Sequence, residues 1–258
     1  MKALMSVRGL TRRFGGLAAL EDVTLEVPDG GVHAIIGPNG AGKTTMLNVL
    51  TGVYAPSEGK ISFGDADLTG QPSHIFARHG IGRTFQTPQI FFNMSALENV
   101  MVGLHRHESQ ALMPAMLRLP RMAVAERSSL DSAVGHMRAV GLGAYLGADS
   151  TTLPYGALKR LEVARALASR PRLLLLDEPA AGLNPSEAVE LAELIRDIAA
   201  GGITVVLVEH NMRLVMSISE TIFVLDQGRR LASGTPAQVR DDPLVIKAYL
   251  GAEDDEDA

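Results

Sequence analysis

The chain has 258 residues, of which 46% are hydrophobic and 21% charged, a balance that fits a folded globular protein and excludes a disordered one. It contains no cysteine, which excludes disulfides, thiolate metal sites and cysteine nucleophiles. The formal net charge of -5 equals the charge of the five acidic residues at positions 253–257. The remainder is therefore formally neutral and offers no general electrostatic attraction to DNA or RNA.

The sequence predicts neither a membrane span nor a signal peptide. No run approaches the roughly 18 apolar residues needed to cross a bilayer. The start, MKALMSVRGLTRRF, lacks a sustained apolar core and a small-residue cleavage site, so we expect a cytoplasmic protein. Residues 251–258 form an acidic tail for which we expect disorder and assign no function.

The first elements along the chain are predicted to be strands. Residues 1–30 and 53–70 alternate polar and apolar side chains between Gly, Pro and Asp turns, which predicts a small antiparallel sheet. Between these regions, residues 32–36 form an apolar run typical of a buried strand. The segment TTMLNVLTG that follows is predicted to be helical.

The rest of the chain alternates predicted helices and strands. Residues 94–170 are predicted to be helical, beginning at a capping box of Ser95 and Glu98. A further helix is expected from 185 to 200, capped by Asn184 with Glu187 at its third position. Apolar runs predict parallel strands at 173–176, 203–208 and 221–225. This alternation predicts an α/β layered core.

The segment GPNGAGKT has the composition and context of a phosphate-binding loop, because it follows a predicted strand and leads into a helix. Its glycines let successive backbone N–H groups converge on phosphate oxygens, and the helix adds its positive end. The Lys43 ammonium is expected to pair with the outer phosphates and the Thr44 hydroxyl to bind Mg²⁺. The residues predicted to bind nucleotide here are Gly37, Pro38, Asn39, Gly40, Ala41, Gly42, Lys43, Thr44 and Thr45.

Three further candidates stand at or just after the ends of predicted strands. Asp177 ends the apolar run LLLLD, and because a buried carboxylate is costly to desolvate without a cation, we interpret it as a magnesium partner. Glu178 is the candidate general base for the water that attacks the terminal phosphate. His210 is a candidate contact to that phosphate. These features indicate phosphoryl chemistry but, taken alone, also fit a nucleotide kinase.

Five motifs in order resemble the ATP-binding subunits of ABC transporters: GPNGAGKT, Gln86 within RTFQTPQIFF, YGALKRLEVARALASRP, LLLLDEPAAGLNP and VEHNM. The resemblance covers the chain up to the acidic tail. It implies an α/β P-loop NTPase of the ABC-ATPase fold, with a RecA-like core, a small antiparallel β subdomain and a helical signature subdomain. The implied domain spans 1–250, with the helical subdomain at about 94–170.

The same resemblance implies ATP and Mg²⁺ as cofactors and assigns roles to further residues. In this family two ATPase subunits close head to tail, and each ATP is held between the phosphate loop of one subunit and the signature segment of the other. Phe14 matches the aromatic residue that stacks on adenine. Gln86 matches the residue that links the magnesium site to the membrane partner, so the implied metal site comprises Thr44, Gln86 and Asp177.

The signature segment departs from the family pattern. The resemblance sets Pro154 against the usual serine, Tyr155 against the first glycine, Gly156 against the second and Ala157 against the glutamine, while Asn184 replaces an aspartate. Proline has neither an N–H nor a hydroxyl to donate, whereas Gly156 and the following helix start retain backbone donors. We therefore expect the site that uses this signature to be the weaker one of an asymmetric pair.

Further segments are similar to the branched-chain amino-acid importer ATPases of the LivG type, namely DEPAAGLNP, VEHNMRLVMSIS and GTPAQVRDDPLVIKAYLG. This resemblance implies a peripheral, ATP-hydrolysing subunit at the cytoplasmic face of the inner membrane. The implied cargo is branched-chain amino acids or related amino acids, amides or urea. The implied partners are a second, non-identical ATPase subunit or a second copy of this chain, two transmembrane permease subunits and, indirectly, a periplasmic substrate-binding protein.

Two other functions stay open on the sequence alone. A soluble ABC-type ATPase acting on nucleic acid or ribosomes fits the same motifs, although the neutral body, the single ATPase unit and the lack of long coiled-coil heptads argue against it. A nucleotide kinase would need an acceptor pocket and would leave the signature segment and His210 without roles. We expect no nucleic-acid partner.

Overall fold

The computed structural model describes residues 3–105 and 120–253, which divide into two compact units. Unit 1 comprises Met1–Arg83 and Arg172–Ala258, and unit 2 comprises Thr84–Pro171. Unit 2 therefore begins before residue 94, where the sequence placed the start of the helical region. Within the described ranges, no helix is both long and apolar enough to cross a membrane.

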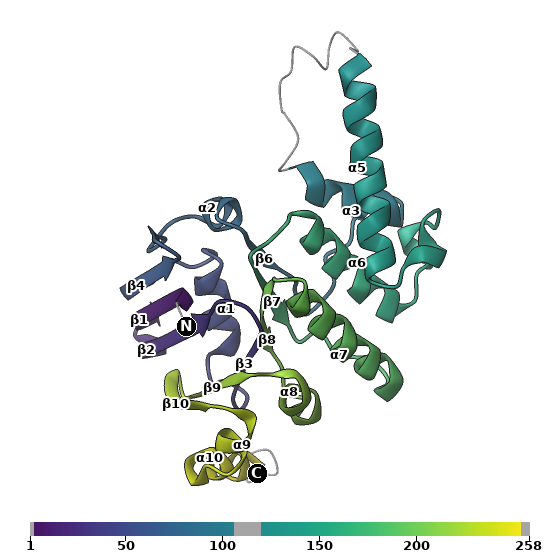
Figure 1. Ribbon diagram of the computed structural model, residues 1–258. Coiled ribbons are helices and arrows are strands. Elements are labelled where there is room, and N and C mark those ends of the chain that lie inside the picture. Colours follow the sequence, from purple (N-terminus) through teal and green to yellow (C-terminus); the bar gives the residue numbers. More distant parts are fainter. Residues whose placement is uncertain (1–2, 106–119, 254–258) are drawn as a thin grey trace. The chain divides into compact units, whose positions relative to one another are not determined.

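The first sheet of unit 1 is antiparallel, with strand order β2-β1-β4-β5 (Figure 1). It is the small sheet predicted from the alternating regions 1–30 and 53–70. The alternation has the expected cause, since Val7, Leu25 and Ile61 are fully buried while their strand neighbours face outward. The strands are β1 (Ala3–Phe14), β2 (Leu17–Pro28), β4 (Glu58–Phe63) and β5 (Ala66–Asp67).

The second sheet of unit 1 has the order β10-β9-β3-β8-β7-β6 and is parallel except for β10. The four predicted strands are confirmed, each to within one residue at either end. The two edge strands went unpredicted because β6 is very short and β10, RRLASG, has no apolar run. The strands are β3 (Val32–Ile36), β6 (Ile81–Arg83), β7 (Leu173–Asp177), β8 (Thr204–Val208), β9 (Thr221–Asp226) and β10 (Arg229–Gly234).

Helix α1 (Lys43–Leu50) fills the core between the two sheets of unit 1. Its Met46, Leu47 and Leu50 are fully buried in one cluster with side chains from β1, β2, β3 and β7. Helix α7 (Pro185–Ala200) instead contacts β3 and β8, and it also touches α8 (Met212–Ile218). Its predicted capping box is confirmed, because the amide of Glu187 donates to Asn184 Oδ1 and the amide of Asn184 donates to Glu187 Oε2.

The C-terminal helices α9 (Pro236–Arg240) and α10 (Pro243–Glu253) lie beside β10 (Figure 1). Because α10 continues to Glu253, the first part of the expected acidic tail is helical. Residues 254–258 of that tail lie outside the described residues. The remaining helix of unit 1 is α2 (Ser73–Arg78).

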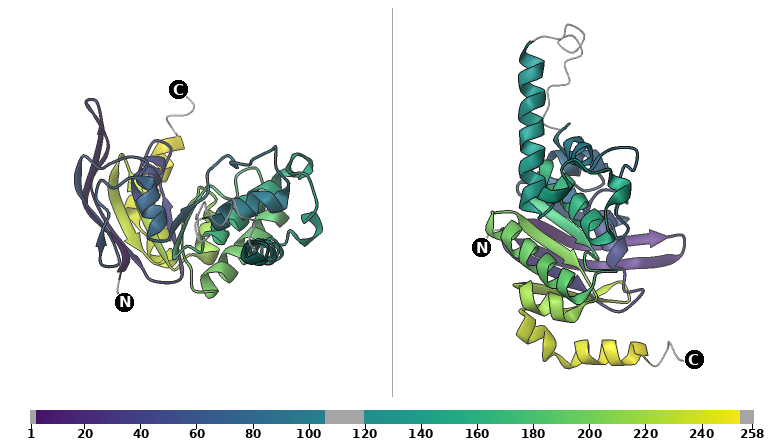
Figure 2. Two further views of the ribbon diagram at one scale, coloured as in Figure 1. Left: turned by 90° about the horizontal axis from the view of Figure 1, so that it is seen from above. Right: turned by 90° about the vertical axis from the view of Figure 1, so that its right-hand side faces the viewer.

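Unit 2 is built from α3 (Ala96–Leu104), α5 (Pro120–Ala139) and α6 (Tyr155–Ala168), which contact one another. Figure 2 shows α5 as a long, straight helix. Helices α3 and α6 approach closely, since a Cβ on Gly103 would lie 2.2 Å from the carbonyl oxygen of Arg165. The Ser95–Glu98 capping box that starts α3 is confirmed. Two 3₁₀ turns, Gly143–Tyr145 and Ser150–Thr152, precede α6.

Candidate functional site

The phosphate-binding loop joins the buried strand β3 to the start of α1 in unit 1. All three of its glycines have positive φ angles, 155° at Gly37, 75° at Gly40 and 96° at Gly42. A Cβ on Gly37 would lie 2.1 Å from the carbonyl oxygen of Leu225, and one on Gly42 would lie 2.7 Å from that of Ala19. Both positions therefore require glycine for space as well as for backbone conformation.

The Lys43 side chain folds back over the loop. Its ammonium donates to the carbonyl oxygens of Gly37 and Pro38, at 2.7 and 2.9 Å. Burial lowers the pKa of Lys43, while the negative charges of Glu178 and Asp177 act in the opposite direction. A cationic group is thus held on the loop beside two acidic residues.

A cavity of about 480 Å³ opens at this loop, a size typical of small-molecule sites. It brings the predicted residues 39–45 together with Glu178, although these lie far apart in the sequence. Two further segments that sequence reasoning did not single out, residues 17–19 and 227–228, complete it. The lining residues are Leu17, Ala18, Ala19, Asn39, Gly40, Ala41, Gly42, Lys43, Thr44, Thr45, Glu178, Gln227 and Gly228.

Phe14 does not belong to the lining of this cavity. The residue is 39% exposed, and its ring meets the Tyr54 ring edge-on, with the ring centres 5.2 Å apart. The Arg12 guanidinium lies over the Phe14 ring, 4.5 Å from its centre. The stacking role of Phe14 on adenine stays a prediction.

The two predicted catalytic side chains lie close together. His210 Nδ1 is 3.9 Å from Glu178 Oε2, and the imidazole is 66% exposed. Glu178 has a φ of 44°, a left-handed conformation that is strained for a non-glycine residue. Its amide donates to the carbonyl oxygen of Val208 at 2.9 Å, which anchors the strained residue to the end of β8. An acid and an imidazole thus share one edge of the parallel sheet.

Glu209 is a site residue that sequence reasoning missed. Its side chain is fully buried, and Oε1 accepts from the amide of Ala180 at 2.7 Å. Oε2 accepts from the amides of His210 and Asn211, at 3.0 and 3.1 Å. One carboxylate therefore ties the segment after Glu178 to the segment that carries His210. The available signal was an acidic residue at the end of an apolar strand, the same pattern that singled out Asp177.

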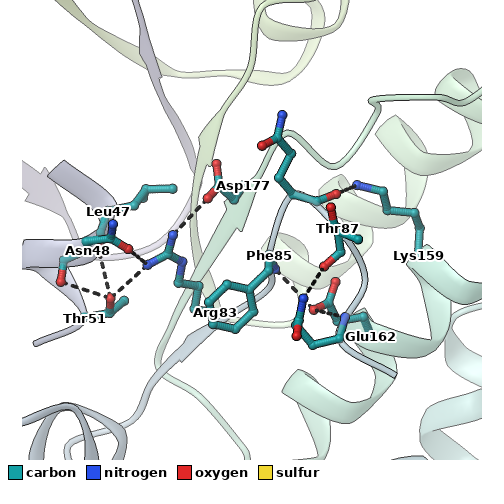
Figure 3. Close-up of polar contacts among 11 residues, drawn as sticks. Leu47, Asn48, Thr51, Arg83, Phe85, Thr87, Lys159, Glu162 and Asp177 are labelled. Atoms are coloured by element: carbon teal, nitrogen blue, oxygen red, sulfur yellow. Dashed lines mark hydrogen bonds and ion pairs between the residues drawn. The ribbon is translucent and has the colours of Figure 1, made fainter. Parts of the chain in front are cut away.

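Asp177 already has a cationic partner in the structure, which corrects the argument that it lacks one. Arg83 Nη2 donates to Asp177 Oδ2 at 2.9 Å, and both side chains are only 7% exposed (Figure 3). The donor chemistry still fits Mg²⁺, because the Asp177 carboxylate and the Thr44 hydroxyl both supply oxygen ligands. No cluster of three or more His, Cys, Asp or Glu side chains placed to hold a metal occurs in the part of the chain that the structure describes.

In unit 2, the loop that carries Phe85 and Thr87 is held by α6 (Figure 3). The Lys159 ammonium, which is buried, donates to the carbonyl oxygen of Gln86 at 2.6 Å. Glu162 Oε1 accepts from the amides of Phe85 and Gln89, each at 3.2 Å. Burial raises the pKa of Glu162, against the effect of these hydrogen bonds. The loop and the signature helix are therefore joined by buried polar contacts.

The signature segment forms the start of the same helix. Pro154 is the N-cap residue, with no side-chain cap, and α6 begins at Tyr155. The amides of Tyr155 and Gly156 belong to the first turn, where no intrahelical acceptor exists. Tyr155 is 44% exposed, whereas Ala157 is buried. The segment thus offers backbone donors at a helix N-terminus, as the sequence predicted.

Comparison with known proteins gives consistent matches. The ABC transporter family model matches residues 20–181, and the model described as branched-chain amino acid ATP-binding cassette transporter matches residues 229–255. The chain is 46% identical over 251 residues to the high-affinity branched-chain amino acid transport ATP-binding protein BraF of Pseudomonas aeruginosa. That match covers 97% of this chain and 98% of BraF.

A second relative and a solved structure extend the match. The chain is 45% identical over 249 residues to the corresponding protein LivG of Escherichia coli K12, covering 96% of this chain and 98% of LivG. It superposes with a TM-score of 0.83 on the ADP conformation of MJ1267, described as an ATP-binding cassette of an ABC transporter. The identity is 29%, and the match covers 97% of this chain and 100% of MJ1267.

Proposed function

This chain belongs to the ABC transporter family of ATP-binding proteins and is an ATPase, and we propose that it powers an importer of branched-chain amino acids. Related amino acids, amides and urea are the other cargoes within the proposal. The observation that carries it is the 46% identity to BraF across 97% of the chain. The C-terminal match at residues 229–255 supports the same cargo class.

In the proposed reaction, the phosphates of ATP lie on the loop of unit 1, where backbone N–H groups and the Lys43 ammonium bind them. Thr44 and Asp177 would hold Mg²⁺, which would supply positive charge to neutralise the outer phosphates. Glu178 orients and deprotonates the attacking water. His210 contacts the terminal phosphate from the same edge of the sheet. Their separation of 3.9 Å supports a shared role for His210 and Glu178.

The signature segment serves a second ATPase subunit in this proposal. Two subunits close head to tail, so the start of α6 faces the nucleotide bound by the partner. Because Pro154 and Tyr155 leave only backbone donors there, the site completed by this segment is the weaker one. The stronger site combines this chain's own phosphate loop with the partner's signature. Differential binding of ATP to the closed pair supplies the bias that drives transport.

The proposed location is the cytoplasmic face of the inner membrane, where the pair binds two transmembrane permease subunits. A periplasmic substrate-binding protein delivers the cargo to those permeases. Gln86, on the loop held by Lys159 and Glu162, links the magnesium site to the membrane partner. ATP binding by the closed pair is thereby coupled to movement of the permeases.

The proposal is tested by purifying the tagged chain from its native membranes in detergent and identifying the co-purifying proteins by mass spectrometry. We expect two polytopic permeases and a second ATPase. Proteoliposomes made from that complex should take up leucine, isoleucine or valine in the presence of ATP and the binding protein. Recovery of ribosomes or nucleic acid without permeases would contradict the importer and favour the soluble ATPase.

A further inference from the structure

We propose that Arg83 is a positioning residue for Asp177, holding one carboxylate oxygen so that the other is directed at Mg²⁺. This inference rests on the proposed function, because it takes Asp177 as a metal ligand. Arg83 is the first residue of the motif RTFQTPQIFF, but the sequence analysis assigned it no role. The observation behind it is the buried ion pair of unit 1 drawn in Figure 3.

The positions of the two side chains follow from the sheet. Strands β6 and β7 are parallel neighbours with Arg83 beside Leu175, so Arg83 and Asp177 project from the same carboxyl edge. Their 2.9 Å contact is a charge-assisted hydrogen bond between side chains that are each 7% exposed. Such contacts are about twice as strong as neutral hydrogen bonds, and weak solvent screening strengthens the attraction further.

The guanidinium is also held from its other side. Arg83 Nη1 donates to Asn48 Oδ1 at 2.6 Å and to Thr51 Oγ1 at 3.2 Å. The Thr51 hydroxyl itself donates to the carbonyl oxygen of Leu47 at 2.7 Å, which leaves its lone pairs for Arg83. Asn48 and Thr51 belong to the end of α1, the helix that starts at the phosphate loop. The planar guanidinium of Arg83 therefore links α1 to the end of β7.

This geometry leaves Asp177 Oδ1 as the oxygen for the metal, because Oδ2 is committed to Arg83. Mg²⁺ demands near-octahedral geometry, so a fixed carboxylate orientation favours its binding. Groups that orient metal ligands typically change metal affinity by about 10- to 100-fold when removed. Loss of Arg83 should therefore weaken metal binding.

Charge compensation alone predicts the opposite sign. If Arg83 only neutralised Asp177, removing its positive charge would increase the attraction of the site for a cation. Arg83→Gln would then tighten metal binding, and Arg83→Lys, which keeps the charge, would leave it unchanged. Positioning predicts weaker metal binding in both variants. Neither glutamine nor lysine can make the hydrogen bonds of the guanidinium to Asp177 on one side and to Asn48 and Thr51 on the other.

The experiment uses the full chain with a non-hydrolysable ATP analogue and measures Mn²⁺ affinity by electron paramagnetic resonance. Metal-free nucleotide binding, measured in EDTA with a fluorescent ATP analogue, is the second readout. We expect Arg83→Gln to weaken Mn²⁺ binding by about 10- to 100-fold, with Arg83→Lys intermediate and metal-free nucleotide affinity unchanged. Arg8→Gln is the matched control, since the Arg8 side chain is 75% exposed and pairs with Glu26 at 3.7 Å on the surface of the first sheet.

Two further variants keep the test decisive. Asn48→Ala removes an anchor of Arg83 without leaving Asp177 unpaired, and it should weaken Mn²⁺ binding in the same direction even if Arg83→Gln does not fold. Asp177→Asn tests the underlying assignment. If Asp177→Asn weakens metal binding but the Arg83 and Asn48 variants do not, the positioning role is overturned alone. If Asp177→Asn leaves Mn²⁺ affinity at the wild-type value, the proposed metal role of Asp177 fails as well.

Discussion

Unit 1 offers a nucleotide a cavity lined by the loop residues 39–45 and Glu178, whereas unit 2 offers the first turn of α6. The first surface combines backbone donors with the charged side chains of Lys43 and Glu178. The second has an N-cap proline and an exposed tyrosine at the positions where the family pattern has polar or small residues. Side-chain chemistry is thus concentrated in unit 1, and the signature segment is left with the positive end of a helix.

The two halves of an ATP site therefore differ, within one chain, in how much they depend on particular side chains. The half that performs chemistry depends on particular side chains, so replacing one of them should strongly reduce ATP hydrolysis. The half that closes over a partner's nucleotide retains backbone N–H groups, which survive substitution of the side chains. Variants in the two units should therefore differ in both the size and the kind of their effects.

The largest effect is expected for Glu178→Gln. Because a general base contributes about 100- to 10,000-fold, this change should nearly abolish ATP turnover while ATP binding is retained. Steady-state phosphate release and equilibrium nucleotide binding measure the two quantities. Glu193→Gln is the matched control, since Glu193 is exposed on α7 and its replacement should leave turnover unchanged. Normal turnover in Glu178→Gln would reject the assignment of the base.

Glycine-to-alanine variants compare how strictly the backbone of each unit requires glycine. Gly37→Ala should destabilise the protein by more than about 1 kcal/mol, because its φ is positive and the new Cβ would clash with the carbonyl oxygen of Leu225. Gly135 lies in α5 of unit 2, with open space around an added Cβ. Gly135→Ala should therefore stabilise the protein by about 0.5–1 kcal/mol. Urea unfolding measures the change in unfolding free energy for both variants. A change of the same sign in both would contradict this prediction.

A smaller gain is expected from repairing the signature segment. The double change Pro154→Ser and Tyr155→Gly adds a hydroxyl donor and removes an exposed ring at the start of α6. One added hydrogen bond is worth about 0.5–1.5 kcal/mol, so hydrolysis at the partner's nucleotide should rise by about 2- to 10-fold. Single-turnover hydrolysis in the complex, with this chain carrying Glu178→Gln, isolates that site. An unchanged or lower rate would mean that the segment is already adequate.

The smallest effects concern one histidine in each unit. Burial lowers the pKa of His33 in unit 1, whose Nε2 donates to the carbonyl oxygen of Gly30. Burial and the nearby Arg170 lower the pKa of His136 in unit 2. Below the unfolded-state pKa of about 6.5, the unfolded chain takes up protons that the folded chain does not. Stability should therefore be highest above pH 6.5 and fall as the pH drops below it.

Glutamine variants identify the contribution of each histidine to this pH dependence. His33→Gln keeps a side-chain donor but cannot titrate, and should flatten the curve more than His136→Gln because His33 is 1% exposed and His136 only half-buried. Thermal melting between pH 8 and about pH 5 measures the difference. A wild-type protein that gains stability on acidification through pH 6.5 would exclude both assignments.

Sequence reasoning succeeded where the signal is local. The strands of the parallel sheet are continuous apolar runs, and the phosphate loop and both capping boxes depend on residues within a few positions of each other. The ABC-ATPase fold class, which was inferred from five sequence motifs in order, is confirmed by the solved relatives. Motif order was therefore sufficient to predict the architecture.

The contacts that went unpredicted join distant parts of the chain. Lys159 reaches Gln86 across 73 positions, and Glu162 reaches the amide of Phe85 across 77. Arg83 lies in a three-residue edge strand without an apolar pattern, so nothing local paired it with Asp177. Such contacts depend on which strands become neighbours, and that information appears only in the folded sheet.

The central claim, that the site on this chain's phosphate loop is the stronger of the pair, is tested most directly in a reconstituted complex with its natural partner ATPase. Steady-state hydrolysis should be compared for Glu178→Gln and for the same change in the partner's equivalent base. If the site on this chain's loop is the stronger one, Glu178→Gln should cause by far the greater loss of hydrolysis. Equal losses from the two variants would contradict the claim.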